Sequence, residues 1–312
     1  MSDIVPQPVE WLWQHRIPLG ELTIVDGDPG VNKSTLTIDL AARVTTGRDM
    51  PDGTPGRAGG VLLLSAEDSV RKTLVTRLAA AGANMSRLWV ATRPLTIPND
   101  MDVIEDAASL IGAKLIVVDP LLVFLGRDAN RDQSIRQGLA PLAQLAQKAN
   151  AAILTVRHLN KSGTRSSLYR GSGSIGIMAA ARSALLVGKC PQDPGRRVMC
   201  HTKSNLGPLA PSLLFEPVDS EGTVVLKWHG ECAYTADDIL KPPTGHGEKL
   251  GGATKFLAEL LGTGLTPQKE VAARAAEARI SFGTLERAKS ALGVESDRQG
   301  FGRGSKVLWR LP

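Results

Sequence analysis

A glycine-rich turn joins an apolar strand pattern to a helical pattern near the start of this chain and limits the folds that the chain can adopt. Residues Leu22 to Asp26 form a short apolar run, and the turn after it leads into a helical pattern. In such a turn the backbone N–H groups and the positive helix end surround a phosphate, a lysine reaches the β- and γ-oxygens, and the next hydroxyl binds Mg²⁺. We therefore predict a nucleotide-binding loop for ATP and Mg²⁺, formed by Gly27, Asp28, Pro29, Gly30, Val31, Asn32, Lys33, Ser34 and Thr35.

One position of this loop departs from the usual pattern, Gly-x-x-x-x-Gly-Lys-Ser/Thr. Asn32 replaces its last glycine. Glycine serves there because it leaves room beside the phosphate and adopts positive φ, and asparagine tolerates left-handed φ best after glycine. We therefore expect nucleotide binding, whereas brisk hydrolysis stays an open question because the asparagine side chain needs space.

Two acidic residues follow apolar strand patterns further along the chain. Asp119 ends the run from Lys114, in the arrangement in which a carboxylate holds Mg²⁺ directly or through water. Glu67 comes just after the run Val61 to Ser65, and a carboxylate at that edge of a wound sheet can polarise the water that attacks the γ-phosphate. The alternative for Glu67 and Asp68 is a cluster that caps a first helical turn.

A histidine occupies a corresponding position after the run Ala151 to Val156. A lone histidine is usually a satisfied polar residue. His158, however, lies at the carboxyl end of a strand expected beside the nucleotide, where it can hydrogen-bond the γ-phosphate or the attacking water. We expect it to report the γ-phosphate to the polar, basic and glycine-rich loop Lys161 to Gly173.

Short β-branched runs alternate with longer helical patterns from Leu22 to Val225. This alternation predicts an α/β fold, a mostly parallel twisted sheet with helices on both faces, and late strands without intervening helices predict an antiparallel extension. The expected strands are Leu22–Asp26, Gly60–Ser65, Leu88–Ala91, Lys114–Asp119, Ala151–Val156, Ser183–Val187, Arg197–Thr202, Leu213–Phe215 and Thr223–Trp228. The expected helices are Lys33–Val44, Ser69–Ala81, Met101–Ile111 and Asp132–Ala149.

The glycine- and proline-rich stretch 241–251 reads as a linker between residues 1–240 and a module of residues 252–312. Three helical patterns and a basic hairpin in this module predict a winged-helix-like domain, with protein binding as the alternative to DNA binding. From Gly252 onward the sequence has ten Lys and Arg residues and six Asp and Glu residues, in a chain of net charge +6. This excess of positive charge fits a polyanion partner. The candidate DNA contacts are Arg287, Lys289 and Arg303.

Cysteine usage and hydropathy exclude several classes of protein. Cys190, Cys200 and Cys232 form no Cys-x-x-Cys pair, so we expect idle thiols in a reducing compartment rather than disulfides or a zinc site. No apolar run reaches the length of a membrane span, and the first residues lack the basic start of a signal peptide. These features favour a cytoplasmic protein with no membrane partner.

The ordered set of motifs resembles the RepA-type hexameric replication helicases of plasmids, phages and prophages, within the RecA-like ATPases. The resemblance is carried by Trp11-Leu12-Trp13, Gly27 to Thr35, Ser65-Ala66-Glu67-Asp68, Val118-Asp119-Pro120-Leu121, Arg157-His158-Leu159-Asn160-Lys161, Gly171-Ser172-Gly173-Ser174 and Lys203-Ser204-Asn205-Leu206.

The resemblance implies a RecA-like P-loop NTPase core, a ring of six copies with ATP between subunits, and movement on single-stranded DNA. It implies that a cation of the neighbouring copy completes each site, with Lys203 as first choice and Arg182 as second. It also implies DNA contacts in the central channel, for which the candidates are Lys161, Arg165 and Arg170.

The sequence therefore predicts an ATP-dependent translocase, helicase or helicase loader in replication of a mobile element. The alternatives are an ATP-gated DNA-binding regulator in which Asn32 slows hydrolysis, and a recombination mediator or signalling ATPase with the same core. Few aromatic residues are present, so contacts to single-stranded DNA are expected to rely on phosphates rather than base stacking.

Overall fold

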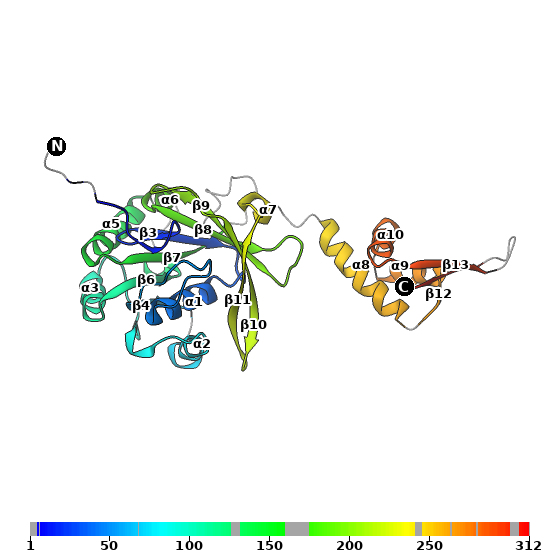
Figure 1. Ribbon diagram of the computed structural model, residues 1–312, viewed down its shortest axis with the longest axis horizontal. Coiled ribbons are helices and arrows are strands. Elements are labelled where there is room, and N and C mark those ends of the chain that lie inside the picture. Colours follow the sequence, from blue (N-terminus) through cyan, green and yellow to red (C-terminus); the bar gives the residue numbers. More distant parts are fainter. Residues whose placement is uncertain are drawn as a thin grey trace. The chain divides into compact units, whose positions relative to one another are not determined.

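A nine-stranded sheet organises residues Met1–Leu240, the larger of two units into which the chain divides (Figure 1). Its strands are β3 Leu22–Gly27, β4 Gly60–Ser65, β5 Leu88–Val90, β6 Ala113–Asp119, β7 Ala152–His158, β8 Ser183–Lys189, β9 Arg197–Ser204, β10 Ser212–Ser220 and β11 Thr223–Cys232. The computed structural model describes residue 5 and residues 7–67, 69–125, 132–159, 175–240, 245–262, 264–278, 280–299 and 306–311.

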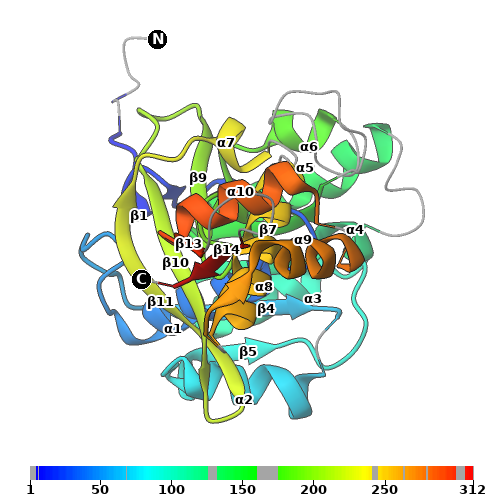
Figure 2. The same ribbon diagram turned by 90° about the vertical axis from the view of Figure 1, so that its right-hand side faces the viewer.

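The strand order is β11-β10-β9-β8-β3-β7-β6-β4-β5. The strands from β8 to β5 in this order run parallel, whereas β9, β10 and β11 pair antiparallel. The predicted parallel sheet with an antiparallel extension is therefore confirmed. The β10–β11 hairpin is longer than expected and reaches α2, the helix Val75–Ala80 (Figure 2).

Helices cover both faces of this sheet. The first face packs against α1 Lys33–Thr46, the π-helical turn η1 Val70–Leu74 and α2. The second face packs against α3 Met101–Leu110, α4 Leu121–Phe124, α5 Asp132–Ala149 and α6 Ile175–Ala180. The connecting segments include the short helices η2 Met85–Arg87 and α7 Ala236–Leu240.

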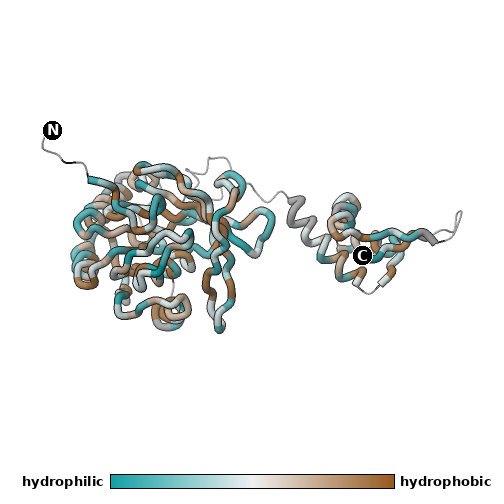
Figure 3. The backbone as a smooth tube through the Cα atoms, in the orientation of Figure 1, coloured by the Kyte–Doolittle hydropathy of each residue, from teal (hydrophilic) through white to brown (hydrophobic). Residues whose placement is uncertain are grey.

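The central strands read as continuous apolar runs because both of their faces are buried. Successive residues of β4 enter opposite cores: Leu63 packs with the α1 side and Leu64 with the α3 and α5 side. The tube in Figure 3 is hydrophobic over much of these strands. The helix expected over 69–81 is present as η1 running directly into α2, so that its first part is π-helical.

A two-stranded ribbon of β1 Trp11–Trp13 and β2 Ile17–Pro18 precedes the sheet. Trp13 is fully buried, and its indole Nε1 donates to Asp52 Oδ2 at 2.9 Å. Arg16 Nε approaches the same carboxylate oxygen at 3.3 Å. The Trp-Leu-Trp motif is therefore a packing element of the first core.

The three cysteines are free thiols that gather at one side of the sheet. Cys190 and Cys200 are buried with Val198 in a small cluster, against which Cys232 packs. Burial raises the pKa of the Cys200 thiol to about 11, so it stays protonated near neutral pH. Among the described residues, no group of three or more His, Cys, Asp or Glu could hold a metal ion.

No helix in the described part of the chain is long and apolar enough to cross a membrane.

The second unit, Lys241–Pro312, has its own apolar core. Its elements are α8 Gly245–Leu261, β12 Thr266–Pro267, α9 Gln268–Glu277, α10 Phe282–Ala291, β13 Glu295–Gln299 and β14 Lys306–Arg310. The strands form an antiparallel sheet of order β12-β14-β13. Trp309 on β14 is 1% exposed and packs in the core with Leu257 and Leu285.

The helix α8 begins at Gly245, inside the stretch 241–251 that the sequence analysis assigned to a linker. The division after residue 240 is unchanged, but the linker ends earlier than residue 251, because the cost of glycine in a helix, about 1 kcal/mol per residue, can be offset by packing. Ala253, Leu257 and Leu261 recur on one side of α8 and are buried in the core of the second unit. This packing outweighs the local preference.

Candidate nucleotide site

The predicted phosphate loop lies at the carboxyl end of β3, in the middle of the parallel strands. Its backbone takes two left-handed conformations, with φ 77° at Gly30 and φ 68° at Asn32. Asn32 is the residue that precedes the first turn of α1, and its side chain makes no capping hydrogen bond there. Asparagine therefore takes the left-handed conformation for which glycine is usually required.

The first glycine of the loop is fixed by lack of space. A Cβ at Gly27 would come within 2.5 Å of the Val187 carbonyl oxygen and 2.9 Å of a Val31 methyl carbon. A backbone oxygen on β8 cannot swing away as a side chain can. Val31 and Thr35 are buried, which anchors the loop on both sides of Asn32.

Lys33 points back into its own loop. Its ammonium donates to the carbonyl oxygens of Gly27 at 2.8 Å and Asp28 at 2.9 Å, and only 5% of the residue is exposed. Burial lowers the pKa of Lys33, while the carboxylates of Asp119 and Asp28 oppose that shift. The lysine is thus a partly desolvated cation, held where a bound phosphate would replace carbonyl oxygens as acceptors.

His158 ends β7 beside this lysine, because Gly27 and His158 are register partners on β3 and β7. The His158 Nδ1 atom lies 3.2 Å from Lys33 Nζ. Since an ammonium group only donates, Nδ1 must accept and Nε2 carries the proton of the neutral ring. Burial, and next the Lys33 cation, lower the pKa of His158, which favours this neutral form.

The proton on His158 Nε2 faces Glu67. The distance from Nε2 to Glu67 Oε1 is 3.9 Å, too long for a direct hydrogen bond but short enough for a water molecule to bridge the two. The Glu67 side chain is 60% exposed, just after β4. The fold thus aligns Lys33, His158 and Glu67 at the edge where the sequence analysis expected them.

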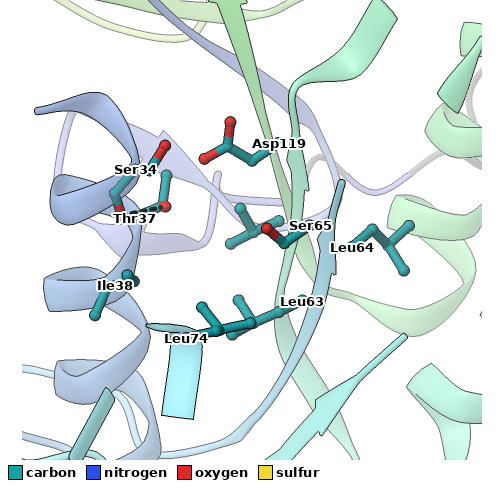
Figure 4. A pocket seen from close by; sticks show the side chains of 9 residues that line it. Ser34, Thr37, Ile38, Leu63, Leu64, Ser65, Leu74 and Asp119 are labelled. Carbon is teal, nitrogen blue, oxygen red and sulfur yellow. Dashed lines mark hydrogen bonds between the residues drawn. The ribbon is translucent and has the colours of Figure 1, made fainter. Parts of the chain in front are cut away.

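Ser34 and Asp119 line one small pocket between α1 and the ends of β4 and β6, together with Thr37 and Ser65 (Figure 4). Asp119 is 8% exposed. A hydroxyl and a carboxylate at one place are suitable oxygen ligands for Mg²⁺, which takes its remaining ligands from phosphates and water. The residues therefore fit a nucleotide-bound Mg²⁺.

Sequence reasoning missed a buried ion pair at the base of the loop. Arg157 Nε and Nη2 donate to the two carboxylate oxygens of Asp26, each at 2.7 Å. The two side chains are 2% and 4% exposed. The only sequence signal was an acid that ends one apolar run and a basic residue directly after another, with nothing to show that the two pair.

The two cations proposed to act on a neighbouring copy lie at the opposite edge of the sheet from Lys33. Lys203 pairs with Ala184 near the start of β8, and Arg182 directly precedes that strand. Lys203 Nζ donates to the carbonyl oxygens of Met178 and Ala181 at 2.6 and 2.7 Å. Arg182 is 51% exposed on its side chain, with Glu21 at 3.8 Å.

The predicted DNA contacts are mostly outside the described part of the chain. Lys161, Arg165, Arg170 and Arg303 lie outside the described residues, and so does the side chain of Arg287, whose backbone belongs to α10. Lys289, on α10, places its ammonium 4.5 Å from the ring centre of Trp309. This cation–π contact ties Lys289 to the core of its own unit.

Comparisons with known proteins place the chain among ATPases. A family model described as an AAA domain matches residues 2–164. Similar curated proteins are the DNA repair protein RadA of Bacillus subtilis, 28% identical over 149 residues, and that of Halalkalibacterium halodurans, 29% identical over 148 residues. Each alignment covers 46% of this chain and only 29% of the relative. Since the family model covers more than half of the sequence and the fold is a RecA-like P-loop core, the chain belongs to the AAA domain family.

Proposed function

We propose that this protein is an ATP hydrolase that acts on single-stranded DNA as a translocase, helicase or helicase loader. The observation that carries the proposal is the alignment of Lys33, His158 and Glu67 at the edge of the sheet where Ser34 and Asp119 meet. The similarity to proteins named DNA repair protein RadA supports a DNA substrate. The resemblance of the ordered motifs to RepA-type helicases supports replication of a mobile element as the setting.

Each residue of the site has a distinct role in this proposal. The loop N–H groups and Lys33 bind the β- and γ-phosphates. Ser34 and Asp119 would hold Mg²⁺, which would neutralise negative charge on the phosphates when bound. Glu67 accepts a proton from the attacking water, while His158 donates from Nε2 toward that water or a γ-oxygen. These roles use the tautomer that the Lys33 contact imposes on His158.

The position of Lys203 and Arg182 supports a shared site in an assembly, for which we propose a homo-hexamer. Both lie at the amino ends of the parallel strands, so neither is placed to touch the nucleotide of its own copy. Arg182 is the freer of the two, since the ammonium of Lys203 is occupied by two backbone carbonyls. We propose that one of them stabilises the γ-phosphate of the neighbouring copy.

Two surfaces are proposed to contact DNA. The basic segment with Lys161, Arg165 and Arg170 follows β7 directly after the γ-phosphate sensor, which supports a contact to the phosphate backbone controlled by ATP. The second unit has three helices and an antiparallel sheet, an arrangement that supports a winged-helix-like domain. There Arg287, Lys289 and Arg303 are the proposed contacts to duplex DNA.

A second candidate function is an ATP-gated regulator or recombination mediator with slow hydrolysis. Asn32 favours it, because the side chain stands where glycine usually leaves the phosphate uncovered. The similarity to proteins named DNA repair protein RadA supports a role in DNA repair. In this alternative ATP controls assembly on DNA instead of driving movement.

The experiment that separates these functions is ATP hydrolysis by the purified protein with and without single-stranded DNA. Stimulation of several-fold supports the motor. Nucleotide binding without appreciable turnover, together with tight binding of duplex DNA, supports the regulator. The Lys33→Ala variant is the control: if it still binds and hydrolyses ATP like the wild type, the site itself is wrongly assigned.

A further inference from the structure

The buried pair Asp26–Arg157 lies one residue before the phosphate loop on β3 and one residue before the sensor on β7. The two residues are register partners, and the next pair along the strands is Gly27 with His158. The Gly27 carbonyl oxygen accepts from Leu159 N at 3.3 Å and from Lys33 Nζ at 2.8 Å. A single peptide group thus links the sensor strand to the phosphate lysine.

Stability alone does not explain the pair. Replacing a buried ion pair by apolar residues of similar volume is often neutral or stabilising, because desolvation offsets the attraction. The preceding positions on both strands, Val25 and Val156, are apolar and fully packed. The planar guanidinium, in contrast, forms two parallel hydrogen bonds with a carboxylate in one geometry only. The pair therefore specifies the position of one strand relative to the other.

Arg157 acts at a distance from the nucleotide. Side chains alternate along a strand, so Arg157 points to the opposite face of the sheet from His158. It therefore influences the site through the backbone that joins these neighbours.

We infer that Arg157, through Asp26, is a positioning residue that holds His158 against Lys33 and so sets the preference of the site for nucleoside triphosphate over diphosphate. This inference rests on the proposed role of His158 as γ-phosphate sensor. Lys33 and the loop N–H groups contact phosphates of both nucleotides, whereas the sensor contacts only the γ-phosphate. Misplacing His158 should therefore weaken triphosphate binding selectively.

The test compares the affinities for a non-hydrolysable ATP analogue and for ADP, measured by calorimetry on the full chain. The variants are Arg157→Lys, which keeps the charge but loses the fork, and the apolar pair Asp26→Leu/Arg157→Met, which keeps the volume and leaves no buried charge. We expect the ratio of the two affinities to fall about tenfold in both, as for loss of one charged hydrogen bond. Adding His158→Ala to either variant should change the ratio no further.

A matched control is Arg16→Met, which breaks another buried ion pair, with Asp52, far from the loop in the fold. It should lower the unfolding temperature and leave the affinity ratio unchanged. A full triphosphate preference in the apolar pair variant would overturn the inference. If His158→Ala alone leaves the preference intact, the sensor role fails, and this outcome is distinguishable because it appears without any change at Arg157.

Discussion

The left-handed conformation of Asn32 gives a quantitative prediction about nucleotide affinity. An L-residue in this region is strained by roughly 1–2 kcal/mol, and asparagine relieves part of that strain. Because Asn32 has φ 68°, alanine at this position should make the binding-competent conformation of the loop about 1 kcal/mol less favourable. That corresponds to a nucleotide dissociation constant about fivefold higher than that of the wild type. Asn32→Gly carries no such strain and should bind at least as tightly as the wild type.

The assay is titration calorimetry of the non-hydrolysable ATP analogue with each variant at one salt concentration. Asn150 provides a matched control, since it has φ 44° after α5 at the opposite edge of the sheet. Asn150→Ala should reduce the stability of the fold by a similar amount without changing nucleotide affinity. Equal affinities of Asn32→Ala and the wild type would show that the left-handed conformation of Asn32 does not limit nucleotide binding, as would an equal loss of affinity in Asn150→Ala.

Three further predictions concern other parts of the chain. Burial lowers the pKa of His201 to about 4, so as the pH falls the unfolded chain takes up a proton at this histidine before the folded chain does. The free energy of unfolding should therefore fall by about 3 kcal/mol between pH 6.5 and 4. Urea unfolding of His201→Gln should show a clearly smaller fall. Leu257→Ala removes a fully buried side chain from the second unit and should destabilise it by about 2–5 kcal/mol, seen as proteolysis after residue 240 with the first unit intact. Lys203→Met leaves two carbonyl oxygens without their donor and should lower the unfolding temperature. Arg182→Ala should keep the unfolding temperature, but its rate of ATP hydrolysis per molecule should no longer depend on protein concentration. Equal unfolding temperatures of the two variants would contradict this contrast.

The positions of several candidate side chains could be predicted from the sequence where chemistry and periodicity coincide, while their roles stay predictions. Asp119 and Glu67 were found because each ends or follows an apolar strand, and parallel strands bring their carboxyl ends to one edge. The same rule placed His158. In each case the local pattern was sufficient to place the side chain, because every parallel strand of the sheet ends at the same edge.

Other features depended on contacts between residues distant in the chain. Asp26 and Arg157 are adjacent only through the pairing of β3 with β7, and the sequence offers no unique partner for either charge. The two carbonyls that bind Lys203 come from the end of α6, so its half-buried state was not apparent. The start of α8 in a glycine-rich stretch was missed because packing of Leu257 outweighs local propensity.

Glu67 is proposed to activate water at a site formed by Lys33, His158, Ser34 and Asp119. The most direct measurement is the rate of ATP hydrolysis by Glu67→Gln in the presence of single-stranded DNA, with nucleotide affinity measured in parallel. We predict a loss of about 10²–10⁴-fold in rate with unchanged affinity, because the amide fills the same space but cannot accept the proton. Hydrolysis at the wild-type rate would show that Glu67 is not the residue that activates water.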